Sequence, residues 1–350
     1  MLFYHGPMKK KGKIVLFTIL GIFLVMLVVF FLGFWNLFGD EIKAIGTIKE
    51  IDDGLYYMEY EGDYGFDEYI RQGGSSSDSE MAEYIISFLS KGFYKTEVTT
   101  KPNDYGCTAV TDGTFMGRNF DWDYGDAMIV RAKPENGYES ISTVCLEFLG
   151  FGEGWKPEGM MNKFMALAGV YVPLDGMNEM GLCIADLIVA YSPETHQNTD
   201  KTDVTTVGGI RLVLDKAATV DEALEILKNV DMNSSIGTNH HYAISDSSGR
   251  CVAVEWVDGV MYVTETPILT NHIVAEGLGE NTGKDESWKR FGMLEGEIVN
   301  DLESLDAMRD VMAKASYENE TLWSIVYNKE DKVLNFYWKR DYSQPIEFQI

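Results

Sequence analysis

One cysteine, Cys107, begins a run of residues whose types suit nucleophilic chemistry. The run starts at Gly106 and reads GCTAVTDGTFMGRNFDWDYGD. Its Asp-Gly pair at 112–113 is a turn signal between two strand-like stretches, so the returning strand would carry Arg118 and Asp121 back toward Cys107. A nearby cation lowers the pKa of a thiol, and a fixed carboxylate orients its partners. These residues predict an activated thiolate, and they leave open a buried structural cysteine beside a surface Arg–Asp pair.

The composition excludes several other classes of chemistry. The chain has 350 residues, 45% of them hydrophobic, which is enough for a large buried core. Its formal charge of -26 argues against a nucleic acid bound through its phosphates. No pair of cysteines has the spacing of a zinc ribbon or a disulfide scaffold, so we expect neither a metal nor a cofactor. We interpret the remaining cysteines as structural; they are Cys145, Cys183 and Cys251.

An apolar stretch precedes the acidic part of the chain. Residues 14–35 contain no charged side chain, and a helix of that length is roughly 33 Å long, enough to cross a bilayer of about 30 Å. Four lysines lie before the stretch, and Asp40 and Glu41 lie after it. This pattern predicts a single membrane-spanning anchor with the N-terminus inside and the rest extracytoplasmic. A cleaved secretory signal is the alternative, although such signals have a shorter apolar region.

The elements that must position Cys107 can be read from patterns farther along the chain. Residues 39–106 have almost no core of their own, with a possible strand pair at 48–60 and a capping box at Ser77 that opens a helix. From Cys107 onward, short apolar runs alternate with further Asp-Gly or Ser-Gly turn signals at 175–176, 248–249 and 258–259. Strands are expected at 241–270 and as a hairpin at 322–338, and helices at 210–230, 286–299 and 305–315.

These strands and helices come in blocks, not in strict alternation. Such blocks favour an α+β layered domain over a doubly wound parallel sheet. The expected helical region at 210–230 contains a second capping-box pattern, formed by Thr219 and Glu222.

Five ordered motifs carry a resemblance to a known family. They are GRNFD after the Gly-Cys junction, DGMNEMGL at 175–182, ILTNH at 268–272, SWKRF at 287–291 and TLWSIVYN at 321–328. Together they resemble the choloylglycine hydrolase family, the linear amide C-N hydrolases that include bile salt hydrolases and penicillin V acylases. The resemblance implies a four-layer αββα N-terminal-nucleophile hydrolase fold, in which the catalytic cysteine is the first residue of the mature chain.

The resemblance also implies a role for each matching residue. Cys107 would be the nucleophile, and its freed α-amine, with an ordinary pKa of about 7.7 to 8.0, would act as the base for its own thiol. Asp121 would hold that amine, Arg118 would lie against the thiolate, Asn271 would donate to the oxyanion and Arg290 would steady the network.

One position departs from the family pattern and concerns the oxyanion. Where the family often has an Asn or Tyr soon after the D-G-x-N-E stretch, this chain has Ile188, which has no side-chain donor. A second oxyanion donor must therefore come from elsewhere, and bile-salt specificity is in doubt. Asp123, His240 and His241 could line a pocket, but solvated or core positions are the simpler interpretation.

These observations predict three segments. Residues 1–38 would form the basic tip and membrane anchor, 39–106 a propeptide-like segment, and 107–350 the catalytic domain. The resemblance to self-processing relatives implies that Cys107 attacks the Gly106 carbonyl and frees its own amine. Gly106 suits this step, because a residue without Cβ allows a strained approach geometry.

The expected activity is hydrolysis of a linear amide C-N bond in a small N-acyl substrate through a thioester. Two alternatives remain: an acyltransferase that passes the acyl group to another amine, and a non-catalytic binding module on the same fold. The acyl group, the amine and the oligomeric state do not follow from these residues.

Overall fold

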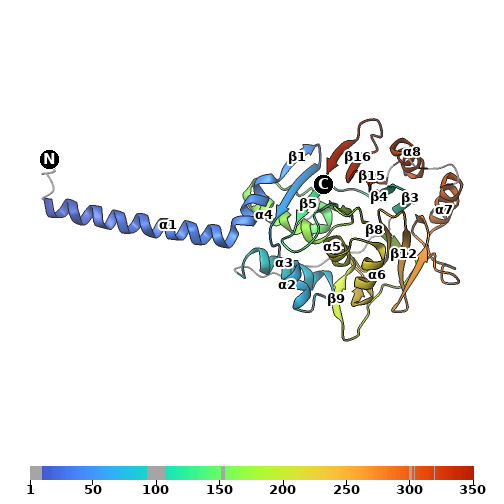
Figure 1. Ribbon diagram of the computed structural model, residues 1–350, viewed down its shortest axis with the longest axis horizontal. Coiled ribbons are helices and arrows are strands. Elements are labelled where there is room, and N and C mark those ends of the chain that lie inside the picture. The colour runs from blue at the N-terminus through green and yellow to red at the C-terminus, as the bar shows by residue number, and fades with distance from the viewer. Residues whose placement is uncertain (1–9, 93–106, 151–153, 299–301, 303, 319) are drawn as a thin grey trace.

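Two β-sheets and the helices on their outer faces make up the body of the molecule (Figure 1). The computed structural model describes residues 10–92, 107–150, 154–298, 302, 304–318 and 320–350. The larger sheet has nine strands in the order β1 (Lys49–Asp52), β2 (Leu55–Glu61), β5 (Ala127–Lys133), β6 (Ser140–Cys145), β7 (Asp175–Asn178), β8 (Cys183–Val189), β11 (Asn239–Ser245), β12 (Cys251–Val257) and β13 (Val260–Glu265).

The smaller sheet has six strands and contains the nucleophile candidate at the start of β3. Its order is β14 (Ile268–Leu269), β3 (Cys107–Asp112), β4 (Phe115–Asp121), β15 (Thr321–Asn328), β16 (Val333–Trp338) and β17 (Ile346–Gln349). A separate parallel pair joins β9 (Thr202–Thr205) to β10 (Val230–Asn233). The helices are α1 (Lys10–Thr47), α2 (Phe66–Arg71), α3 (Asp78–Leu89), α4 (Gly159–Ala166), α5 (Thr206–Lys216), α6 (Val220–Lys228), α7 (Asp285–Ile298) and α8 (Leu305–Ala315), with 3₁₀ turns η1 (Leu146–Leu149) and η2 (Leu167–Tyr171).

Three apolar cores separate four layers. Between the sheets, Phe120 and Trp323 of the smaller sheet share one core with Leu187 of the larger. Helices α2, α3, α5 and α6 cover the outer face of the larger sheet, and α7 and α8 cover the outer face of the smaller. Because both faces of each sheet are covered, strands such as β4 and β8 are buried along their whole length. The expected αββα arrangement of an α+β domain is confirmed.

Local signals placed most helices and hairpins correctly. Ser77 Oγ accepts from the Glu80 N–H at 3.3 Å at the start of α3, and Thr219 Oγ1 accepts from the Glu222 N–H at 3.2 Å at the start of α6. Helix α8 has the predicted bounds, and β15 and β16 form the predicted hairpin. Of the strands expected at 241–270, the last, β14, pairs with β3 in the other sheet.

The prediction of a turn at 175–176 was wrong. Both residues lie inside β7, and the chain turns later, at Gly181, whose φ is +80°. A Cβ on Gly176 would lie 2.7 Å from a Leu214 methyl and 2.8 Å from the Ile141 carbonyl oxygen. This glycine therefore permits the close approach of α5 to the sheet. The Asp175-Gly176 pair has the sequence of a turn, but it lies within a strand.

Residues 39–92 are built into the larger sheet. Strand β2 pairs in parallel with β5 over seven residue pairs, from Leu55–Ala127 to Glu61–Lys133. Side chains of β2, α2 and α3 enter the core beneath α5 and α6. As expected, this segment has no core of its own, because its buried side chains share that of the larger sheet. The boundaries at 38/39 and 106/107 stay predictions, and Gly106 itself lies outside the described residues.

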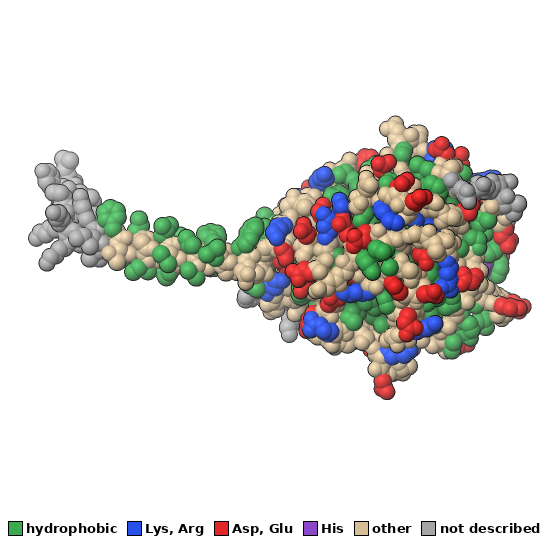
Figure 2. Space-filling view, viewed as in Figure 1, with side chains coloured by type: hydrophobic (Ala, Val, Ile, Leu, Met, Phe, Trp, Pro, Cys, Tyr) green, Lys and Arg blue, Asp and Glu red, His purple; other side chains and the backbone are tan. Residues whose placement is uncertain are grey.

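Helix α1 projects from the body as a single long helix (Figure 1). Its part from Phe17 to Thr47 contains an 18-residue window with a mean hydropathy of 2.8 and is long and apolar enough to cross a membrane, a test that a signal sequence also passes. Hydrophobic side chains surround the projecting stem (Figure 2). Only its last turns, which include the buried Ala44 and Ile45, pack against the body.

Candidate active site

Cys107 lies at the open end of the β3–β4 hairpin. It pairs with Phe120 in the antiparallel register, and Ala109 pairs with Arg118. Because alternate residues of a strand share a face, this register places the Cys107 and Arg118 side chains on the same side of the sheet. The Arg118 guanidinium and the thiol line the same cavity. Burial raises the pKa of the Cys107 thiol, and the positive charge of Arg118 opposes that rise.

Arg118 is held by a buried set of acceptors. Its Nε lies 3.3 Å from Asp175 Oδ2, and its Nη2 donates to the Asp186 carbonyl at 2.9 Å. Asp175 Oδ1 in turn accepts from Thr143 Oγ1 at 2.8 Å and from the Tyr327 hydroxyl at 2.6 Å. The guanidinium is therefore fixed in front of the thiol and compensated by a carboxylate behind it.

A second arginine connects the remaining site candidates. Arg290, on α7, donates from Nη1 to Asp121 Oδ2 at 2.9 Å and from Nη2 to Asn271 Oδ1 at 2.7 Å. Its Nη2 also lies 3.3 Å from the Cys107 carbonyl oxygen. Asp121 Oδ1 accepts from Thr321 Oγ1 at 2.6 Å. Burial raises the pKa of the Asp121 carboxyl, and the charge of Arg290 opposes that rise.

The backbone nitrogen of Cys107 is also engaged. It donates to Asn271 Oδ1 at 2.7 Å, and the Nδ2 of the same Asn271 donates to the Ile188 carbonyl at 2.7 Å. The structure thus brings all five residues proposed from sequence into one cluster. It pairs the Cys107 nitrogen with Asn271, while the contact between that nitrogen and Asp121 stays a prediction for a cleaved chain.

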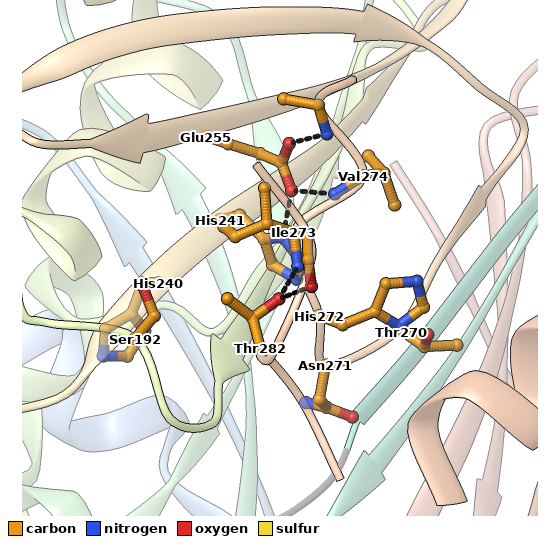
Figure 3. Close-up of polar contacts among 12 residues, drawn as sticks. Ser192, His240, His241, Glu255, Thr270, Asn271, His272, Ile273, Val274 and Thr282 are labelled. Atoms are coloured by element: carbon orange, nitrogen blue, oxygen red, sulfur yellow. Dashed lines mark hydrogen bonds and ion pairs between the residues drawn. The ribbon is translucent and has the colours of Figure 1, made fainter. Parts of the chain in front are cut away.

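The loop that carries Asn271 is anchored from β12 and β11 (Figure 3). Glu255 accepts from the backbone N–H groups of Val274 at 2.9 Å and Ala275 at 2.8 Å. It also makes a 2.9 Å contact with His241 Nδ1, and both of these side chains are fully buried. A carboxylate that binds two consecutive N–H groups and an imidazole restrains the loop strongly.

His272, next to Asn271, faces away from the nucleophile. Its Nδ1 lies 2.9 Å from Ser287 Oγ, and its ring stacks on Trp288 with centroids 3.5 Å apart. Burial, and then the charge of His241, lowers the pKa of His272 to about 4, so the ring is neutral at pH 7. His272 therefore helps to dock α7, which carries Arg290.

A cavity of about 390 Å³ opens at the thiol. Arg118, Asp186 and His240 are among its ionisable lining residues, and most of the other described ones are apolar, including Ile188. His240 Nδ1 lies 2.8 Å from Asp186 Oδ2. Burial alone would lower the pKa of His240, but the charge and hydrogen bond of Asp186 raise it overall. The cavity thus combines a thiol and a histidine–aspartate pair with predominantly apolar walls.

Sequence reasoning missed several residues that complete this arrangement. Asp175 lay inside a quoted motif but was interpreted as part of a turn. Glu255 has no local signal, because its loop contacts are about 20 residues away along the chain. His240 was assigned to the core or to solvent, although it lines the cavity with Asp186.

Comparisons with known proteins point to one group. A family model described as linear amide C-N hydrolases, choloylglycine hydrolase family, matches residues 107–273. A penicillin V acylase of Pectobacterium atrosepticum is 34% identical in an alignment of 117 residues, and the match covers 29% of this chain and 31% of that protein. This chain thus spans less than a third of the length of that relative.

Solved structures with similar folds include two enzymes with related names. A variant of the conjugated bile acid hydrolase of Clostridium perfringens is 16% identical, with a TM-score of 0.49, and the match covers 69% of this chain and 92% of that one. The penicillin V acylase of Agrobacterium tumefaciens is 17% identical, with a TM-score of 0.42 and coverages of 69% and 84%.

Proposed function

Because this chain belongs, through residues 107–273, to the linear amide C-N hydrolases of the choloylglycine hydrolase family, we propose that it is an amidohydrolase with Cys107 as its nucleophile. The observation that carries the proposal is the convergence on Cys107 of Arg118, Asp121, Asn271 and Arg290, at the mouth of a cavity. Nucleophile, cations and amide donors within reach of one another are the parts that acyl transfer requires.

The first step is the release of the Cys107 amine. The thiol attacks the Gly106 carbonyl, the C–N bond to Cys107 breaks, and its nitrogen takes a proton to become a free amine. Water then hydrolyses the resulting thioester and leaves Gly106 with a new carboxylate. This step supplies the base, since among the described residues His272 is turned toward Ser287 and both ring nitrogens of His240 are engaged, Nδ1 with Asp186 and Nε2 with the Ser235 carbonyl.

Substrate cleavage then repeats the same chemistry. The α-amine takes the thiol proton, and the thiolate attacks the amide carbonyl while Arg118 stabilises its charge. The tetrahedral oxyanion accepts from Asn271 Nδ2, which carries a second hydrogen besides the one donated to Ile188. The leaving amine takes the proton from the α-ammonium, and water hydrolyses the thioester to release the acid and restore the thiol.

Intact-mass measurement tests the processing step. The purified full chain should yield a fragment that begins at Cys107, and Cys107→Ala should remain uncut. An active enzyme whose only species is uncut would show that a free α-amine is not the base.

A substrate panel tests the activity itself. Acylated amino acids, bile-salt conjugates and penicillin V should be scored for release of the amine, with Cys107→Ala as the control. Hydrolysis by the wild-type chain and at least a 10³-fold loss in the variant is the expected result, since removal of the nucleophile removes the covalent route. Equal hydrolysis by both chains would rule out Cys107 as the nucleophile.

We further propose that α1 spans a membrane with residues 107–350 on the extracytoplasmic side. The exposed apolar stem of α1 and the lysines that precede it support this orientation. Protease added to intact cells should digest the body of the protein but leave the segment around Lys9–Lys13 protected. If the body of the protein were protected from the protease instead, its topology would be the opposite of the one proposed.

A further inference from the structure

A second cavity adjoins the one at Cys107. The two cavities share four lining residues, Phe148, Val207, Ser235 and Ile236, and we call the pair the groove, with the second cavity as its outer part. The empty space of the second cavity, counted together with open solvent, is about 810 Å³, compared with about 390 Å³ at the thiol.

The outer part of this groove offers an apolar surface. Among the described residues that line it, Asp78 is the one charged side chain, and it accepts from the Ile236 N–H at 2.7 Å; Ser235 Oγ faces the Val207 N–H at 3.5 Å. The remaining surface is predominantly hydrophobic and is formed by Met81, Ala82, Ile85 and Ile86 together with Leu149 and Val172. A polar group placed there would lose its water without gaining a partner, whereas an aliphatic chain would gain contacts.

Helix α3 supplies one whole wall of the groove. Its first residue, Asp78, holds Ile236, whose φ of +47° is a strained conformation for a β-branched residue. Ile236 lines both cavities, so this contact fixes the junction between the thiol and the outer groove. The wall therefore comes from the chain ahead of Cys107, not from the part that matches the family model.

We propose that this outer groove is the acyl-chain site, that α3 determines the chain length it accepts, and that the substrates are amides of extended aliphatic acyl groups. The proposal rests on the proposed amidohydrolase function. The acyl side of the substrate lies along α3 because the amine must leave as a polar, protonated group, and the described lining of the outer groove is predominantly apolar. The amine lies on the side of Asp186 and His240.

A series of N-acylglycines, from acetyl to octanoyl, tests the assignment on the full chain in detergent. Burial of each added methylene should raise kcat/KM by roughly threefold to fourfold until the groove is filled. Ala82 is half-buried and lines the groove, so Ala82→Trp should reduce the octanoyl-to-acetyl ratio of kcat/KM at least tenfold. Ala82→Leu should reduce the octanoyl-to-acetyl ratio less. This variant can still be measured if the tryptophan prevents folding.

Glu83→Trp is the matched control, because Glu83 is the next residue on the same helix and is exposed. It should leave the octanoyl-to-acetyl ratio unchanged. A second series of N-alkylacetamides places the same carbons on the amine, and it should show no such rise with chain length.

The outcomes separate this inference from the function on which it rests. If the wild-type chain hydrolyses all acylglycines equally, or if both Ala82 variants keep the wild-type ratio, the acyl-chain site is wrong while the amidohydrolase function stands. A rise with alkyl length in the amine series would reverse the orientation. If no amide is hydrolysed in a Cys107-dependent way, the proposed function fails and the inference fails with it.

Discussion

The surroundings of Cys107 are those of an uncut peptide. Its nitrogen has one hydrogen, which it donates to Asn271, and burial raises the pKa of its thiol. Cleavage at Gly106 would turn that nitrogen into an amine with further hydrogens and, when protonated, a positive charge. Asp121, which Arg290 and Thr321 hold nearby, is the carboxylate that we expect to accept them. The same side chains can therefore serve processing first and substrate cleavage afterwards.

Glu255 is a positioning residue in this scheme, since it touches the loop of Asn271 and not the nucleophile. Glu255→Gln should weaken its bonds to the N–H groups of Val274 and Ala275 and lower kcat about tenfold or more, with a smaller effect on KM. Glu276→Gln, at an exposed glutamate beside the same loop, should leave kcat unchanged. Steady-state kinetics on both variants decides the matter, and an unaltered kcat in Glu255→Gln would contradict the role.

His240 should make the stability of the protein depend on pH. Its pKa is raised in the folded protein above the ordinary value of about 6.5. Protonation therefore favours the folded state: the contribution is complete below about pH 6.5 and is lost as the pH rises through the folded pKa. The Tm difference between wild type and His240→Gln should thus be largest at acidic pH and shrink toward pH 9.

The matched control for this pH series is His196→Gln, because the His196 side chain is half exposed. It removes one imidazole without removing the buried pair with Asp186. If the Tm difference between wild type and His240→Gln grew with rising pH, the pKa of His240 would be lowered, not raised, in the folded protein.

At the scale of elements, the position of α5 depends on one glycine of β7. Gly176→Ala would place a methyl against the Leu214 side chain and the Ile141 carbonyl, and the backbone oxygen cannot move aside. We expect a loss of about 1–3 kcal/mol in the free energy of unfolding, seen as a Tm lower by several degrees. Because Asp175 precedes this glycine, activity should fall as well.

Gly292→Ala is the control for that substitution. Gly292 lies on the exposed face of α7, and a Cβ there would meet no atom within 4 Å. Replacement of a helical glycine by alanine should raise stability by up to about 1 kcal/mol. If Gly176→Ala and Gly292→Ala changed Tm equally, the close approach of α5 would not be the reason for a glycine at position 176.

At the scale of the whole molecule, the segment ahead of Cys107 is held by much more than its peptide bond. Strand β2 is paired with β5 along its full length, and the buried Tyr64 hydroxyl donates to Asp215 Oδ2 at 2.7 Å. A cut before Cys107 would leave these contacts intact. The catalytic part should therefore stay attached to α1, and through it to the membrane, without a covalent link.

Copurification tests this association. After processing, the fragment that begins at Cys107 should coelute with the N-terminal fragment on size-exclusion chromatography in detergent. It should separate only in denaturant, because removal of β2 would expose the apolar side chains of β5 and the core beneath it. Release of the Cys107 fragment into the soluble fraction of cells would contradict a noncovalent tether.

The sequence by itself determined the features that depend on neighbours along the chain. Capping residues placed the starts of α3 and α6, turn residues closed the β3–β4 and β15–β16 hairpins, and an uncharged run of 22 residues predicted the projecting part of α1. The motif resemblance added Asn271 and Arg290, whose distance along the chain from Cys107 hides them from local patterns. These signals are local or are carried by short motifs, so they can be recognised without knowledge of the fold.

Only the tertiary structure decided which distant segments of the chain contact one another and which residues reach the site. It made residues 39–92 part of the larger sheet and of the groove wall, assigned Gly176 to packing, and brought His240 and Glu255 to the site. Each of these outcomes depends on which faces pack together, and a residue such as Asp78 meets Ile236 across 158 positions of the chain. Local propensity does not encode such a contact, because its energy arises only when both faces are buried together.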